Sequence, residues 1–427
     1  MKSTERMKRI IGLFFLVVPF FAAGFPLAKG YAVEYRLGSE IFLGLFREEN
    51  FLDTSGGTFD YDETYTILGI YPNVSLNFNE HFTAYALAEL EWFYSWDAEQ
   101  TEDENEIYAT LSDIFVNFSA VGLTLDIGLQ PFIVGRGVVF YSDEPGISIG
   151  YDGWQDVNIR GEGFRIFDHS PMATLTLGYQ PGFLESVEII GAWYHDADNK
   201  IAELYIPFYK KKNVKTSGHF FWAGLQTDFF VRKLYISASM IQQFGSVQLD
   251  NGTDSLNFDV SAYLIDLEAG YNISQKLTVA AFFFSASGDS HPTTGKLHAF
   301  VSPMPFNPRT AIFFNGGFER YDIEDAVLLG GVTWDGVSAP GIRIEYQPNP
   351  KVETELIAAA LFPQTDLFDT EHWYGWEVDA RVSYTFYQNH QIFFETGILR
   401  QGGYLEPAYG FRPDDAVRVA GGVHLVF

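Results

Sequence analysis

Short runs of alternating apolar and polar residues recur along the whole chain, and this alternation limits the folds open to it. In GIRIEYQ (341–347), apolar residues alternate with Arg343 and Glu345. A period of two places alternate side chains on opposite faces of a β-strand. Similar runs at 123–130 and 376–386 predict a chain built from strands that each have one apolar face.

Aromatic residues make up 17% of the chain and cluster at the ends of the predicted strands. Trp92, Tyr94 and Trp96 end one strand, while Trp376 and Phe386 lie near the two ends of another. A soluble sandwich also alternates, but rings at both strand ends are typical of barrels that cross the outer membrane. A bilayer tolerates no open sheet edge. The sequence therefore predicts an all-β fold, a closed antiparallel transmembrane β-barrel.

The N-terminus has the features of a secretory signal peptide. The basic stretch MKSTERMKRI leads into an apolar run at 10–21, and Gly30 and Ala32 have the small-x-small spacing of a cleavage site. A transmembrane anchor is the alternative, but the run is shorter than the ~20 residues that a spanning helix needs. We predict that residues 1–32 are removed as a signal peptide and that 33–427 form the outer-membrane β-barrel domain.

Connections of two lengths alternate along the chain. Short turns such as 79–81 and 387–391 alternate with long polar stretches such as 141–156 and 287–309. Short turns on the periplasmic side and long loops outside are the pattern of bacterial barrels. At roughly 22 residues per strand and connection, the chain gives about 18 strands, with 16 to 20 left open. The pattern also places both termini on the periplasmic side.

The chain ends in AVRVAGGVHLVF, where every second residue counted back from Phe427 is apolar or small. This stretch resembles the terminal strand of bacterial outer-membrane barrels. The resemblance implies that Phe427 is the signal recognised by the barrel assembly machinery. It also implies an integral protein of the bacterial outer membrane, in contact with membrane lipid and lipopolysaccharide.

Three parts of the chain carry a narrower resemblance. LSDIFVNFSAVGLTLDIGLQPFIVGRG (111–137) contains a strand, a turn and a strand ending in G-x-Q before a GRG loop, and 152–166 fits loosely. The stretch 306–405 adds a GG segment, a Y-x-P turn and a G-x-E-x-D strand. Together they resemble the alginate-export family of outer-membrane barrels. That resemblance implies a lumen lined with arginines that carries a polyanionic polysaccharide.

Composition and missing motifs exclude several functions. The net charge of −28 argues against a nucleic-acid partner, because phosphate binding needs basic patches. The chain has no Cys, which rules out disulfides, iron–sulfur clusters and thiolate-bound metals. H-E-x-x-H does not occur in it. We expect no cofactor, no metal site and no enzymatic activity.

Charged residues on the polar faces of the predicted strands, and in the loops beside them, are candidates for the wall of a pore. The predicted pore-lining residues are Arg136, Arg160, Arg343, Glu345, Glu377, Asp379, Arg381, Glu395 and Arg418. Glu377, Asp379 and Arg381 form either part of a selectivity constriction or an internal ion-pair ladder. Arg136, between two glycines, lies on an inward-folded constriction loop or in an ordinary turn. Across the clearest strands inward carboxylates outnumber arginines, which predicts a preference for cations.

These features predict a passive outer-membrane channel for small polar solutes or saccharides. A dedicated exporter of one polysaccharide is an alternative within transport. A structural sleeve around a periplasmic electron-transfer partner is an alternative of another class. A sleeve would purify with a stoichiometric partner, and a channel would not.

Overall fold

The computed structural model describes most of the chain after the predicted leader. The described residues are 33–53, 58–96, 105–181, 186–203, 215–250, 255–290, 295–305, 309–314, 327–328, 335–365, 371–404, 406–409, 411–412 and 414–427. The signal peptide predicted at 1–32 lies outside these residues, so its removal stays a prediction.

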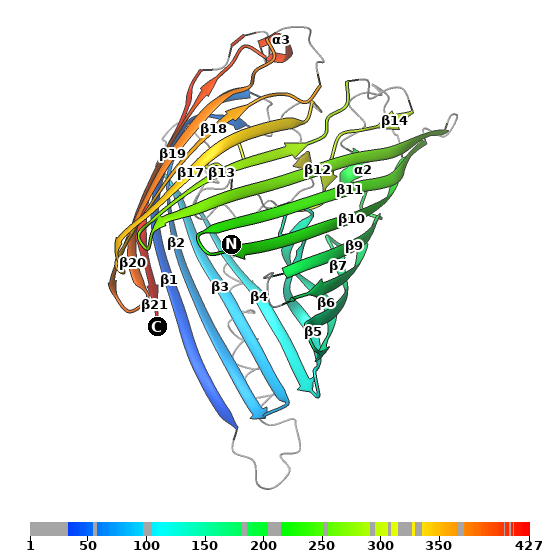
Figure 1. Ribbon diagram of the computed structural model, residues 1–427, viewed down its shortest axis with the longest axis vertical. Coiled ribbons are helices and arrows are strands. Elements are labelled where there is room, and N and C mark those ends of the chain that lie inside the picture. Colours follow the sequence, from blue (N-terminus) through cyan, green and yellow to red (C-terminus); the bar gives the residue numbers. More distant parts are fainter. Residues whose placement is uncertain are drawn as a thin grey trace.

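Eighteen strands form a closed antiparallel barrel, which confirms the predicted fold class. The strands are β1 (Glu34–Asp53), β2 (Thr58–Asn79), β3 (Phe82–Ser95), β4 (Asn105–Ala120), β5 (Leu123–Val134), β6 (Phe140–Trp154), β7 (Val157–Ile166), β8 (Ser170–Tyr179), β9 (Ser186–Asp196), β10 (Lys215–Val231), β11 (Leu234–Asp250), β12 (Ser255–Ser274), β13 (Leu277–Ala286), β17 (Val337–Asn349), β18 (Val352–Leu361), β19 (Gly375–Tyr387), β20 (His390–Gln401) and β21 (Ala416–Val426). The two-residue strand β14 (Lys296–Leu297) joins the same sheet by pairing in parallel with β12. Figure 1 shows the strands following one another around the wall in chain order.

The last strand pairs with the first and so closes the barrel. β21 runs antiparallel to β1, and Figure 1 shows the red strand beside the blue one. Beyond the paired strands, the backbone amide of Phe427 donates to the carbonyl of Ser39 at 2.9 Å. The ring of Phe427 lies beside that of His390, with 5.0 Å between centroids. The alternation at the end of the sequence therefore belongs to a strand of the closed wall.

The two faces of each wall strand differ as the alternation predicts. On β1, Leu43 and Leu45 are about half exposed on the outer face, whereas Phe42 and Phe46 are buried on the inner face. Exposed apolar side chains recur on the outer faces of the other strands, and in a bilayer such a band contacts lipid. The main buried cluster lies inside the barrel, where wall residues such as Trp222 pack with segments folded inward.

The strands are joined by tight turns at one end of the barrel and by connections of varied length at the other. The connection between β13 and β17 contains β15 (Val301–Ser302) and β16 (Val327–Leu328), which pair with each other. Two one-turn helices, α2 (Lys200–Glu203) and α3 (Glu406–Tyr409), lie in other connections. None of the helices in the described ranges is long and apolar enough to cross a membrane.

The prediction of a long connection at 141–156 is wrong. Residues Phe140–Trp154 form β6, which pairs with β5 and β7. Ile147 and Ile149 lie on its outer face, and Pro145 takes part in the pairing with β5. Proline and glycine weaken a strand pattern when the sequence is read alone. The neighbouring strands on both sides supply the pairing that local preference lacks.

Candidate functional site on the inner wall of the barrel

A series of ion pairs runs along the inner face of consecutive strands. We call it the charged belt, and it comprises Asp266, Glu268, Arg343, Glu355, Arg381, Glu395, Arg418 and Glu48. Arg343 on β17 contacts Glu268 on β12, and its Nη1 lies 3.8 Å from Glu355 on β18. Ala280 stands opposite Arg343 on the intervening strand β13. Its small side chain lets the guanidinium reach across to β12.

The charged belt continues across the seam between the last and first strands. Arg381 on β19 lies 3.2 Å from Glu355 and 2.7 Å from Glu395 on β20. Arg418 on β21 lies 2.9 Å from Glu395 and 3.0 Å from Glu48 on β1. Arg418, Glu395 and Glu48 are all fully buried. Buried charges need partners of opposite sign, so these three groups depend on one another.

Part of the connection between β13 and β17 folds into the barrel. We call it the inner loop, and it comprises residues 295–305 and 309–314. The side chain of Gln243, on the wall strand β11, donates to the carbonyl of Val301 at 3.1 Å and accepts from its amide at 3.0 Å. The amide of Tyr141 donates to the carbonyl of Met304 at 2.8 Å. The inner loop is thus bonded to the wall and to the start of β6.

Two carboxylates on β19 clamp the other end of the inner loop. Glu377 accepts hydrogen bonds from the Thr310 hydroxyl at 2.8 Å and from the Ile312 amide at 2.6 Å. Asp379 accepts from the amide of Ala311 at 3.0 Å. Hydrogen bonds in a buried, water-poor environment are electrostatically stronger than those exposed to water. The clamp therefore fixes consecutive loop residues against the wall.

The position of Gly397 on β20 makes room for this clamp. A Cβ atom at Gly397 would lie 2.4 Å from Oδ1 of Asp379 and 3.4 Å from Cδ1 of Ile312. Contacts that short force neighbouring groups to move. The absent side chain leaves space for the Asp379 carboxylate and for the loop above it.

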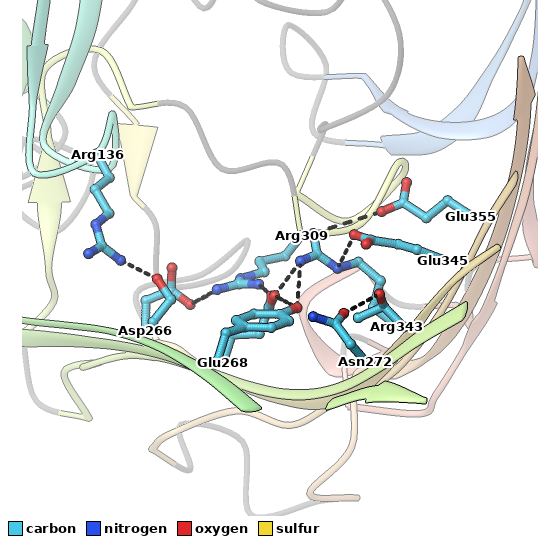
Figure 2. A network of polar contacts seen from close by, with 11 residues as sticks. Arg136, Asp266, Glu268, Asn272, Arg309, Arg343, Glu345 and Glu355 are labelled. Carbon is cyan, nitrogen blue, oxygen red and sulfur yellow. Dashed lines mark hydrogen bonds and ion pairs between the residues drawn. The ribbon is translucent and has the colours of Figure 1, made fainter. Parts of the chain in front are cut away.

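Arg309 ties the inner loop to the charged belt. Its Nη2 lies 2.6 Å from Asp266, its Nη1 contacts Glu268, and its guanidinium lies over the ring of Phe282. Figure 2 shows Arg309 and Arg343 both directed toward the carboxylates on β12. Glu268 therefore holds one arginine of the loop and one of the wall.

The structure groups five of the nine predicted pore-lining residues in or beside the charged belt. They are Arg343, Glu345, Arg381, Glu395 and Arg418. Glu377 and Asp379, at 0% and 1% exposure, contact the inner loop rather than solvent. Of the three residues that share a face on β19, Arg381 joins the ion-pair series and the two carboxylates hold the loop. Their part in lining an open pore stays a prediction.

Arg136 lies in the turn that joins β5 and β6. Gly135, Arg136 and Gly137 have φ values of 64°, 57° and 92°, so all three adopt the left-handed conformation of a tight turn. The guanidinium of Arg136 pairs with Asp228 on β10 at 2.9 Å and contacts Ser237 on β11. The residue is therefore in a turn, and its side chain reaches the inner wall.

Arg160 on β7 is the most accessible of the predicted arginines. Its Nε lies 2.8 Å from Glu162 and 3.0 Å from the hydroxyl of Ser148, and its side chain is 52% exposed. With Asp126 and Asn158 it lines an open pocket of about 430 Å³. No group of three or more His, Asp or Glu that could hold a metal ion occurs in the ranges that the structure describes.

Sequence reasoning missed Arg309, Glu48 and Gln243. Glu48 lies on the same face of β1 as Phe42, so the period of two predicts that it points inward. Its burial depends on distant strands. Arg309 follows a proline in an irregular connection, where no period indicates a direction. Only the folded chain shows that this connection enters the barrel.

No family model matches the sequence, and no curated protein matches it. Solved barrels match most of its length. Pseudomonas aeruginosa OccK9 (OpdG) has a TM-score of 0.58 and 10% identity, over 92% of this chain and 99% of that one. OccK8 (OprE) of the same organism has a TM-score of 0.55 and 12% identity, over 92% of this chain and 98% of that one. Pseudomonas aeruginosa OpdK, solved with vanillate, has a TM-score of 0.54 and 11% identity, over 92% of this chain and 99% of that one.

The fold is that of an outer-membrane porin. Identities of 10–12% support this likeness of fold and leave the solute to be argued from the residues of this chain. The narrower alginate-export resemblance rests on the sequence motifs alone.

Proposed function

We propose that the protein is a passive channel of the bacterial outer membrane for small polar solutes. A closed wall with an apolar outer band fits a bilayer, and a charged inner face gives polar solutes a path through it. The fold shared with outer-membrane proteins such as OpdK supports this location. No step of the proposal requires enzymatic chemistry.

The inner loop is the observation that carries the proposal of a channel for small solutes. It is bonded to β11 at one end and to β19 at the other, so it occupies lumen that a polymer would need. The arginines of the charged belt are paired with carboxylates, so they offer a polyanion little free positive charge. Both features favour small solutes over an alginate-like chain or a partner protein inside a sleeve.

Liposome swelling with sugars of increasing size tests this proposal. We expect monosaccharides to enter liposomes that contain the folded barrel and long oligosaccharides to be excluded, because the inner loop narrows the passage. Liposomes with heat-unfolded protein are the control. Entry of alginate oligomers as fast as of monosaccharides would favour the polysaccharide exporter. Purification with a stoichiometric periplasmic partner and no swelling would favour the sleeve.

A further inference from the structure

Strands β3 and β4 carry an inward carboxylate that lacks an arginine partner. Trp92 and Ile107 pair across these strands and are exposed on the outer face, so Tyr85, Glu89 and Asp113 lie on the inner face. Asp113 is 8% exposed, and its Oδ1 has no hydrogen-bond partner in the part of the chain that the structure describes. The carboxylates of the charged belt, by contrast, are paired.

A β-bulge places a second unpartnered oxygen next to Asp113. Leu87 pairs with Asp113 and Ala88 with Leu111, so Ser112 is the extra residue of the bulge. Ser112 is 6% exposed, and its hydroxyl also lacks a partner among the described residues. Bulges re-aim side chains and are frequent beside functional sites. Buried polar groups without partners are few in native proteins, and a bound water or ion is a common explanation.

The electrostatic surroundings of this bulge are negative. The carboxylate of Glu89 interacts electrostatically with Asp113. The carboxylates of Asp113 and Glu40 interact electrostatically with Tyr85. None of the described groups acting on Asp113 is a lysine or an arginine. Burying a carboxylate without a partner of opposite charge is strongly unfavourable. Adjacent carboxylates in a lumen concentrate positive counter-ions.

We propose that the bulge between β3 and β4 is a binding station for a small hard cation inside the barrel. Asp113 supplies its unpartnered Oδ1, Ser112 its hydroxyl, and Glu89 a second negative charge nearby. Oxygen ligands of this kind suit hard cations. This proposal rests on the proposed channel function. It implies that small cations are a class of solute that binds transiently in the lumen.

Terbium binding to the folded barrel in detergent tests the station without relying on conduction. Tb³⁺ is a hard cation whose luminescence is sensitised by a nearby tyrosine, here Tyr85. We expect Asp113→Asn to weaken Tb³⁺ binding about tenfold, because a lost charged acceptor is worth about 1.4 kcal/mol or more. Ser112→Ala, which removes no charge, should weaken it less. Excess Ca²⁺, which is also a hard cation, should displace the probe.

Asp126→Asn is the matched control. It removes one inner-wall carboxylate that accepts a hydrogen bond from Asn117 at 2.6 Å, away from the bulge. Equal weakening in both Asn variants would mean diffuse attraction and would overturn the station. Unchanged binding in Asp113→Asn would mean that a proton neutralises Asp113, which also overturns it.

Single-channel recording in KCl separates this proposal from the channel proposal. If the barrel conducts, a station predicts conductance that saturates with K⁺ and a higher half-saturating concentration in Asp113→Asn than in Asp126→Asn. A barrel that never conducts would refute the channel function. In that case the terbium result would still decide whether the bulge binds a cation.

Discussion

Arg418 is a residue whose whole side chain lies in the barrel interior. It sits between Glu395 and Glu48, with its guanidinium 5.5 Å from the centre of the Phe46 ring. An arginine suits this place because its planar group can pair with two carboxylates and still pack on an aromatic face. Removing it would leave two buried carboxylates without their shared partner.

We expect Arg418→Met to lower the free energy of unfolding by about 3–5 kcal/mol, the usual cost of breaking a buried ion pair. Urea unfolding of the barrel in detergent, followed by tryptophan fluorescence, measures the change. Arg36→Ala is the control. Arg36 and Glu34 form a pair that is mostly exposed, so we expect a change of about 0–1 kcal/mol. Equal effects of both substitutions would contradict the argument.

Phe427 has a different role from Arg418. Its backbone extends the pairing with Ser39, while the residue is 66% exposed and its ring lies beside the ring of His390. The ring thus contributes little to packing and is accessible for recognition. We expect deletion of Phe427 to reduce the heat-modifiable barrel in the outer membrane while signal cleavage continues. Undiminished barrel, measured by gel shift, would refute its role as an assembly signal.

Among the elements, the inner loop and β19 depend on each other. The loop has little secondary structure of its own, so its position comes from groups on the wall. Glu377 and Asp379 are fully buried by the same contact that fixes the loop. The same contacts therefore bury these carboxylates and narrow the lumen.

We expect the double variant Glu377→Ala and Asp379→Ala to raise single-channel conductance, because the loop residues lose their acceptors and leave the wall. Bilayer recordings of the variant and the wild type measure the difference. Glu353→Ala serves as control, since it removes a carboxylate of β18 that forms no hydrogen bond with the described residues of the inner loop. Unchanged conductance in a folded double variant would show that the clamp does not hold the loop in the passage.

A smaller clamp joins two turns at the long-loop end of the barrel. Despite partial burial, hydrogen bonds from the His169 amide and the Ser170 hydroxyl hold the pKa of Asp198 below its usual value. A depressed carboxyl pKa stabilises the clamp above pH 3.8 and loses that effect as pH falls through the lower value. We expect Ser170→Ala to raise the Asp198 pKa, measured by an NMR titration of the side-chain carboxyl.

For the whole molecule, the distribution of paired and unpaired charge decides selectivity. The arginines of the charged belt are paired with carboxylates. In contrast, carboxylates such as Asp113 and Asp126 form no ion pair with an arginine of the described strands. The lumen should therefore have a net negative potential. Such a bias weakens as salt screens the charges.

We expect a preference for cations in a bilayer under a salt gradient, strongest at low ionic strength. Arg343→Gln with Arg381→Gln should increase that preference, because Glu268, Glu355 and Glu395 lose their compensating charges. The reversal potential measures both effects. An anion preference in the wild type would restore a polyanion as the favoured cargo.

The sequence predicts the barrel well because the wall is built from a local signal. A period of two, read over a few residues such as those around Arg343, states which side chains face in and which face out. The terminal strand follows from the same period. Where proline and glycine interrupt it, as in β6, the strand is missed, because pairing with two neighbours outweighs local preference.

The candidate site is less predictable because its contacts join distant parts of the chain. The sequence places Glu377 and Asp379 on the inner face of a strand but gives no sign that residues 310–313 cover them. An irregular connection has no period from which its path can be read. Which carboxylate meets which arginine, as for Glu48 and Arg418, depends on strand order and register.

The seam between β1 and β21 has a consequence for how the protein folds. The ion pair between Glu48 and Arg418 joins groups 370 residues apart in sequence. Contacts of such separation carry a large loop-closure entropy and slow the formation of a native topology. Hairpins of neighbouring strands can form early, but the ring of hydrogen bonds is complete only when the two ends of the chain meet. Folding of this barrel should therefore finish with a single late closure, slower than the hairpin steps before it.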